Sequence, residues 1–292
     1  ELKRSGNLLL AHRNKRIRPL LDDKIILGWN ALMNTACSKA FAATGNEGYR
    51  QLAIENMEFL LSAFAESGSE KLYHTWKDDQ ARYPAFLDDY ASLIQALIQL
   101  QEITTNTRWL IEAEKLTSFV LDNFSETETA YFYYTPVWQN DVIIRKKEVY
   151  DGAVPSGNSV MGYNLWQLSL LLDKEDWQKR AREMVSSLGL AVVRYPTSFG
   201  NWGCLLQEIV AGTSEIAIIG GGFLKTMAEV LAEYIPHRVL MASDRVNPDF
   251  PLLIGKSANE QTTIYLCRNY TCLNPVFSAK ELMLLINKGK NR

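Results

Sequence analysis

Three short polar segments carry the residue types that could perform chemistry. Each combines carboxylates with an aromatic ring, an amide or a hydroxyl group. The segments are residues 21–24 leading to Trp29 and Asn30, residues 86–90, and residues 151–159. Carboxylates and amides bind pairs of hydroxyl groups, aromatic rings stack on the apolar face of a sugar, and two separated carboxylates can perform acid/base cleavage. The segments therefore predict a groove for a small, sugar-like ligand.

Roles follow from the residue types. Asp23, Asp89 and Asp151 are the predicted catalytic residues, one as the acid and another as the base or nucleophile. Trp29 is expected to stack on a sugar ring, and Asn30 is expected to bind its hydroxyl groups. The other predicted ligand-binding residues are Asp22, Lys24, Asp88, Tyr90, Ser156 and Asn158. No metal or cofactor is expected.

Structural roles compete with these assignments. Asp88, Asp89 and Ser156 could instead cap helices, because side-chain oxygens there accept bonds from free backbone amides. Asp22 and Asp23 could form a solvated turn with Lys24 as a weak partner. His74 could transfer protons, although we favour a satisfied or exposed loop histidine. For Cys267 and Cys272 we favour unlinked structural thiols over a redox pair, and a redox pair over a metal site.

Helices must position these segments. Apolar residues from Trp29 to Phe41 recur at steps of three and four, which predicts a helix that Gly45 ends. The same period predicts further helices over residues 49–64, 90–101, 109–120, 160–172 and 177–188. Paired helices of this kind indicate stacked antiparallel hairpins in a solenoid or an α/α toroid.

Strands are expected in two places. Aromatic and β-branched residues at 131–134 and 142–149 predict a β-hairpin inserted over one end of the helices. After residue 212, strands at 215–219, 238–242 and 262–266 alternate with a helix at 223–234, and a last helix starts at Ser278. We therefore expect a helical region over residues 1–212 and a small α/β appendage over 213–292, packed together. Gly220 to Gly222 is interpreted as a tight turn.

Composition narrows the partners. The 292 residues include 31 basic and 33 acidic side chains, a net charge of -2 that favours neither nucleic acid nor an anionic membrane. No apolar run reaches the roughly 18 residues that a membrane span needs, and residues 1–18 lack the apolar stretch of a signal peptide. We expect a soluble, cytoplasmic protein, although a mature secreted chain would have the same features.

The three segments, in this order, resemble the YyaL-like family of thioredoxin-domain proteins. The matching stretches are 21–24 with 29–33, 86–87 with 89–91, 151–153 with 155–159, and 265–275. The family's central region resembles an (α/α)6 six-hairpin glycosidase or an N-acylglucosamine 2-epimerase. Ala31 stands where the family commonly has glycine, and the family's usual thioredoxin-like domain with its Cys-x-x-Cys motif is missing. The sequence thus looks like a carboxyl-terminal fragment.

The resemblance implies a carbohydrate-handling toroid, glycosidase-like or sugar epimerase-like. The alternative is a non-catalytic scaffold that partners a thioredoxin-like domain. A closed six-hairpin ring needs twelve helices, and the sequence predicts fewer. We therefore expect a mainly α, incomplete (α/α)6 ring whose apolar flank is covered by a second copy in a homodimer or by the residues before Asp22.

Overall fold

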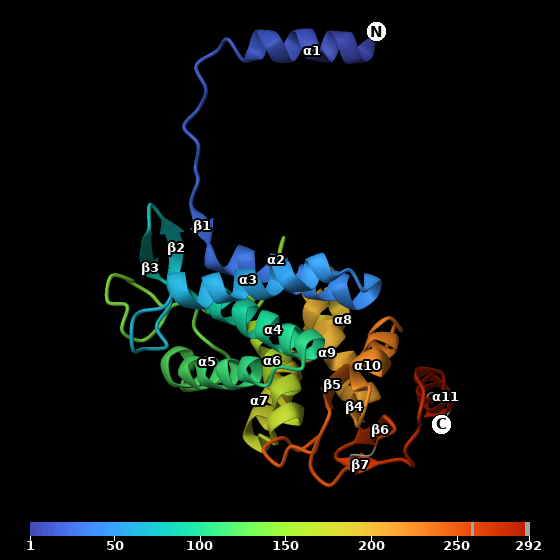
Figure 1. Cartoon of the computed structure of the whole chain (residues 1–292). Helices are drawn as coiled ribbons and strands as arrows, with labels where there is room; N and C mark the ends of the chain where they lie inside the picture. The colour runs from blue at the N-terminus through green and yellow to red at the C-terminus, as the bar shows by residue number, and fades with distance from the viewer. Residues whose placement is uncertain (258–259, 290–292) are drawn as a thin grey trace.

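The computed structural model describes residues 1–257 and 260–289, and its main feature is a set of helices in two layers (Figure 1). In the inner layer α2 packs against α4, α4 against α6, and α6 against α9. In the outer layer α3, α5 and α7 each pack on the inner helix that precedes them. The bounds are α2 (Leu27–Thr44), α3 (Glu47–Ala63), α4 (Leu87–Thr104), α5 (Arg108–Phe124), α6 (Gly157–Leu172), α7 (Glu175–Leu188), α8 (Ala191–Arg194), the 3-10 turn η1 (Pro196–Ser198) and α9 (Gly200–Ala211).

This arrangement confirms the predicted fold class, a mainly α, incomplete toroid of helical hairpins with a small α/β appendage. The predicted helix ends also agree with local chemistry. Gly45 ends α2 in the left-handed conformation at φ 67, and its amide donates to the Phe41 carbonyl. Asn46 then begins α3 by accepting a hydrogen bond from the Gly48 amide at 2.9 Å.

The inserted β-hairpin lies elsewhere than predicted. A three-stranded antiparallel sheet has the order β1 (Ile25–Ile26), β2 (Tyr73–Lys77), β3 (Gln80–Pro84), so the hairpin joins α3 to α4. The prediction of strands at 131–134 and 142–149 is wrong, because those residues form irregular loops. Side chains bond the backbone groups that pairing between two strands would use. Asn158 of α6 bonds the amide and carbonyl of Phe132, and Arg145 bonds the Thr135 carbonyl.

The C-terminal part is a four-stranded sheet with two helices; three of these strands and both helices were predicted, and the short strand β7 was not. Its strand order is β5-β4-β6-β7, with β4 parallel to β5 and antiparallel to β6. The elements are β4 (Ser214–Ile219), α10 (Phe223–Leu231), β5 (Arg238–Ser243), β6 (Thr263–Arg268), β7 (Thr271–Cys272) and α11 (Ala279–Gly289). Gly220 and Gly222, at φ 115 and 75, form the tight turn before α10.

The sheet packs against the inner helices. The elements α10 and β5 contact α2, α4 and α6, so they cover the inner side of the ring. By contrast, α1 (Leu2–Arg13) and the residues up to Lys24 are exposed, and Figure 1 shows α1 well away from the helical layers. The expectation that residues before Asp22 cover the open ring is therefore wrong. The appendage does so instead, since its apolar strands must themselves be buried.

The cysteines also differ from the prediction. Cys267 and Cys272 form a disulfide rather than unlinked thiols. The antiparallel pairing of β6 with β7 places these two residues directly opposite each other, which brings their sulfur atoms together. Cys37 is buried and Cys204 is an exposed free thiol.

The described residues contain neither a membrane-spanning helix nor a metal-binding cluster. None of the helices in residues 1–257 and 260–289 has the length and apolar character to cross a membrane. In the same part of the chain, no three His, Cys, Asp or Glu side chains gather closely enough to hold a metal ion.

Candidate functional site

A small pocket lies where the amino-terminal ends of the inner helices meet, and we call it the mouth pocket. It has a volume of about 140 Å³. Helix amino termini carry partial positive charge, so this end of the ring favours carboxylates. The lining residues are Ile26, Gly28, Trp29, Leu32, His74, Asp88, Asp89, Ser92, Gln95, Tyr134, Val154, Pro155, Gly157, Val160 and Asn201.

Asp89 organises one side of the mouth pocket. Its Oδ1 accepts a hydrogen bond from the Gly28 amide at 2.9 Å. Its Oδ2 accepts bonds from the Phe86 amide at 2.9 Å and from His74 Nδ1 at 2.8 Å. Asp89 is only 2% exposed, and it stands in the first turn of α4, where a carboxylate also caps the helix. Both oxygens are thus engaged in fixing α2, α4 and β2 relative to one another.

His74 is the second titratable group in the mouth pocket. It projects from β2, and its ring packs against Phe86 with centroids 4.9 Å apart. The hydrogen bond to Asp89 raises the pKa of His74, and partial burial only partly opposes that rise. Because Nδ1 is bound to Asp89, Nε2 is the nitrogen left to meet a ligand.

Asp88 is the third. Burial raises its pKa to about 6, the charge of Asp89 adds to the rise, and the nearby amide of Gly157 partly offsets it. Its buried Oδ1 has no hydrogen-bond partner among the described residues. A Cβ at Gly157 would lie 2.3 Å from that oxygen, so glycine allows α6 to approach α4 this closely.

The polar side chains of the segment at 151–159 serve the protein's own structure, whereas its Val154, Pro155 and Gly157 line the mouth pocket. Asp151 accepts hydrogen bonds from the Ser156 amide at 3.0 Å, the Ser159 hydroxyl at 2.7 Å and the Asn201 amide at 2.9 Å. Ser156 caps α6, and fully buried Asn158 bonds Phe132 and the Glu148 carbonyl. Asp151, Ser156 and Asn158 are absent from the lining of the mouth pocket.

In the segment that runs from residue 21 to residue 30, Trp29 lines the mouth pocket and the predicted polar residues do not. Trp29 is 69% exposed and lines the mouth pocket. Asp23 forms an ion pair with Lys77 of β2, since β1 pairs with β2 two residues later, and Asp22 pairs with Lys24 at 3.4 Å. Asp22, Asp23 and Lys24, together with Asn30, lie outside the lining. The Asn30 amide donates to the Ile26 carbonyl at 2.9 Å.

Tyr90 is also structural, because it is fully buried and its hydroxyl bonds the Leu72 amide and the Glu70 carbonyl. Of the predicted site residues, the mouth pocket therefore unites Trp29, Asp88 and Asp89. The expected convergence of Asp23 and Asp151 with Asp89 on this pocket does not occur.

Sequence reasoning missed two contributors. The first is the pair Ser92 and Gln95 of α4, which line the mouth pocket. They begin a polar stripe that continues through Gln99 and Glu102, and its spacing of three and four indicates a second helix face. The second is Asn201 of α9. The sequence does not reveal it, because Gly200 and Gly203 weaken the helical pattern of that segment.

Comparisons with known proteins place the fold. No family model matches the chain. It is 26% identical to human spermatogenesis-associated protein 20 across 96% of this chain and 38% of that protein. It is 25% identical to an uncharacterised protein of Caenorhabditis elegans across 94% of this chain and 39% of that protein. The chain thus spans about two fifths of the length of these relatives.

Among solved structures, the chain resembles a GH76 α-mannanase of Bacteroides thetaiotaomicron, with a TM-score of 0.51 and 12% identity over 75% of this chain and 64% of that one. A cellobiose 2-epimerase of Bacillus thermoamylovorans gives a TM-score of 0.46 with 15% identity over 56% of this chain and 44% of that one. At these identities the first likeness shows a shared α/α-toroid fold.

Proposed function

We propose that this chain binds a neutral sugar in the mouth pocket and transfers protons to and from it, in a glycosidase-like or sugar epimerase-like reaction. The observation that carries the proposal is that Asp88 and His74 line the same pocket, both with raised pKa values. The fold shared with an α-mannanase supports a carbohydrate ligand. Two adjacent carboxylates, Asp88 and Asp89, disfavour anionic sugars by repulsion.

The protonation states assign the roles. Above a pH of about 6 the Asp88 carboxyl is ionised and acts as the general base. Below its raised pKa, His74 is protonated and acts as the general acid. Asp89 is a positioning residue, because it holds Nδ1 of His74 and has no free oxygen for the substrate. Exposed Trp29 supplies the stacking surface for the sugar ring.

The test is the pH dependence of turnover. We expect activity on a panel of mannose, mannobiose and cellobiose, followed by NMR, to rise through about pH 6 and to fall through the pKa of His74. Asp88→Asn should lower kcat by about 10²-fold or more and His74→Gln by a similar factor. Exposed Asp244→Asn is the matched control and should change nothing.

Two results would oppose the proposal. Turnover that persists unchanged in Asp88→Asn would remove Asp88 from the reaction. Binding of sugars without turnover would favour the scaffold, and with it partnership with a thioredoxin-like domain as the resemblance to YyaL-like proteins implies. A homodimer belongs to the same proposal, and sedimentation of the purified chain tests it.

A further inference from the structure

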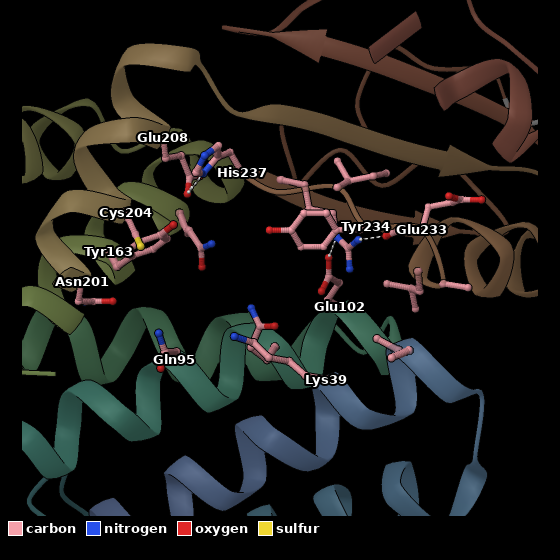
Figure 2. A pocket seen from close by; sticks show the side chains of 18 residues that line it. Lys39, Gln95, Glu102, Tyr163, Asn201, Cys204, Glu208, Glu233, Tyr234 and His237 are labelled. Atoms are coloured by element: carbon pink, nitrogen blue, oxygen red, sulfur yellow. Dashed lines mark hydrogen bonds and ion pairs between the residues drawn. The ribbon is translucent and has the colours of Figure 1, made fainter. Parts of the chain in front are cut away.

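A second, larger space lies along the axis of the ring, and we call it the axial cavity. It has a volume of about 540 Å³ and lies between the inner helices and the segment 231–238 that leads from α10 to β5 (Figure 2). Gln95 and Asn201 line both the axial cavity and the mouth pocket. The two spaces therefore meet at these two side chains.

Glu208 of α9 is the most unusual group in the axial cavity. It is 0% exposed and lines the cavity wall. Its Oε1 accepts a hydrogen bond from the Thr213 hydroxyl at 2.9 Å. Its Oε2 faces His237 Nδ1 in a long ion pair of 3.5 Å, and neither atom makes a hydrogen bond within the part of the chain that the structure describes. A buried carboxylate oxygen left in this state costs free energy unless a ligand donates to it.

The side chains next to Glu208 also line the axial cavity. Figure 2 shows Tyr163, Cys204 and His237 grouped with Glu208 on one side of the cavity. Burial raises the pKa of the Tyr163 phenol, and the charge of the adjacent Glu208 and a hydrogen bond with it raise that pKa further. The phenol is a hydrogen-bond donor at neutral pH, as a tyrosine ordinarily is. A donor, an acceptor and an imidazole from three separate elements thus face one volume.

The remaining wall mixes polar and apolar side chains and is nearly neutral, since it also carries the opposite charges of Lys39 and Glu233. The charges of Glu102 and Arg238 cancel in an ion pair of 2.7 Å. Gln99 and Gln167 add amide groups, which can both donate and accept. Hydroxyl groups, which also donate and accept, match such a wall better than a charged ligand does.

We propose that the axial cavity is a second subsite, which holds further units of a neutral oligosaccharide whose end unit occupies the mouth pocket. Glu208 Oε2 accepts a hydrogen bond from a hydroxyl of one of these units. The inference rests on the proposed function, because the end unit must bind at Asp88 and His74. It adds the substrate class: a chain of sugars rather than a monosaccharide.

Cys204 provides a direct report on the axial cavity. It lines the cavity and is exposed, whereas Cys37 is buried and the other two cysteines are joined. The rate of alkylation by iodoacetamide should therefore follow Cys204, and Cys204→Ser should abolish the signal. We expect mannotriose to slow this alkylation and mannose to leave it unchanged.

Two variants separate the subsite from the mouth pocket. Glu208→Gln keeps the shape of the side chain and should weaken mannotriose binding about tenfold in calorimetry while mannose binding is unchanged. Gln167→Leu removes an amide that makes no bond to the described residues, so it should act in the same direction without disturbing the fold.

The outcomes distinguish this inference from the proposed function. Mannotriose that protects Cys204, with protection lost in Glu208→Gln and reduced in Gln167→Leu, supports the subsite. Mannotriose that binds in calorimetry without protecting Cys204 overturns the subsite and leaves the mouth pocket intact. If neither mannose, mannobiose, mannotriose nor the matching glucose oligomers bind the wild-type chain, the proposed function and the subsite both fail.

Discussion

Asp88 is in an environment that opposes its own charge. Its Oδ1 is buried without a hydrogen-bond partner among the described residues, and burial together with Asp89 raises its pKa to about 6. Folding would be easier with a neutral side chain at this position. Such a conflict between stability and ionisation is typical of groups that are retained for chemistry.

The conflict gives a prediction for stability. Because the folded pKa of Asp88 lies above the ordinary 3.8, the folded state prefers the protonated form. Its contribution is fully favourable below pH 3.8 and is lost as the pH rises through about 6. We expect Asp88→Asn to increase the free energy of unfolding by about 1–3 kcal/mol at pH 8, with the gain shrinking toward zero near pH 4.

Urea unfolding at both pH values checks this prediction. The control is Asp244→Asn, whose carboxylate is 73% exposed. Equal effects of the Asp88 substitution at pH 4 and pH 8 would contradict a buried, pH-dependent carboxyl.

The first turn of α6 lies directly against the first turn of α4 at Gly157. A Cβ at Gly157 would lie 2.3 Å from Asp88 Oδ1 and 3.1 Å from the Asp88 amide, which is backbone and cannot rotate away. Gly157→Ala should therefore separate the two helix ends and lower stability by about 1–3 kcal/mol. It should also lower turnover in the mouth pocket.

A matched control is available in α9. A Cβ at Gly203 would meet only Val192, at 3.9 Å, so Gly203→Ala should be neutral or slightly stabilising. Thermal unfolding of both variants provides the comparison, and a Gly157→Ala chain as stable and active as the wild type would refute the close approach.

The elements show what a sequence can and cannot predict. The helix from Trp29 to Phe41 and its end at Gly45 follow from apolar period and glycine, because both signals are local. The hairpin expected near residues 131–149 fails because Asn158, distant in sequence, takes the backbone groups of Phe132. Residue types likewise indicated Asp88 and Asp89, but only the fold shows that Asp23 lies beside Lys77 and that His74 bonds Asp89.

The helical layers and the sheet are joined by polar contacts. Arg238 of β5 binds Glu102 of α4 at 2.7 Å, with both side chains largely buried. The Trp166 indole of α6 donates to the Thr213 hydroxyl at 2.9 Å, just before β4. The Tyr270 hydroxyl donates to the Leu170 carbonyl near the end of α6. These contacts fix the appendage across the inner side of the ring.

A double-mutant cycle tests the strength of that junction. Glu102→Gln or Arg238→Met should each lower the free energy of unfolding by about 2–4 kcal/mol, because each leaves a largely buried charge without its partner. The double variant should cost less than the sum of the two. Additive losses in urea unfolding would show that the pair does not couple the two parts.

Trp29 gives the opening of the ring an optical property. The chain has seven tryptophans. The side chain of Trp29 is 69% exposed to solvent, whereas those of Trp109, Trp166 and Trp202 are at most 3% exposed. Collisional quenchers dissolved in water reach an indole only where solvent does. Trp29 therefore gives the most quenchable and most red-shifted part of the intrinsic fluorescence, ahead of the half-buried Trp76, Trp138 and Trp177, and it reports on events at the mouth pocket without any added dye.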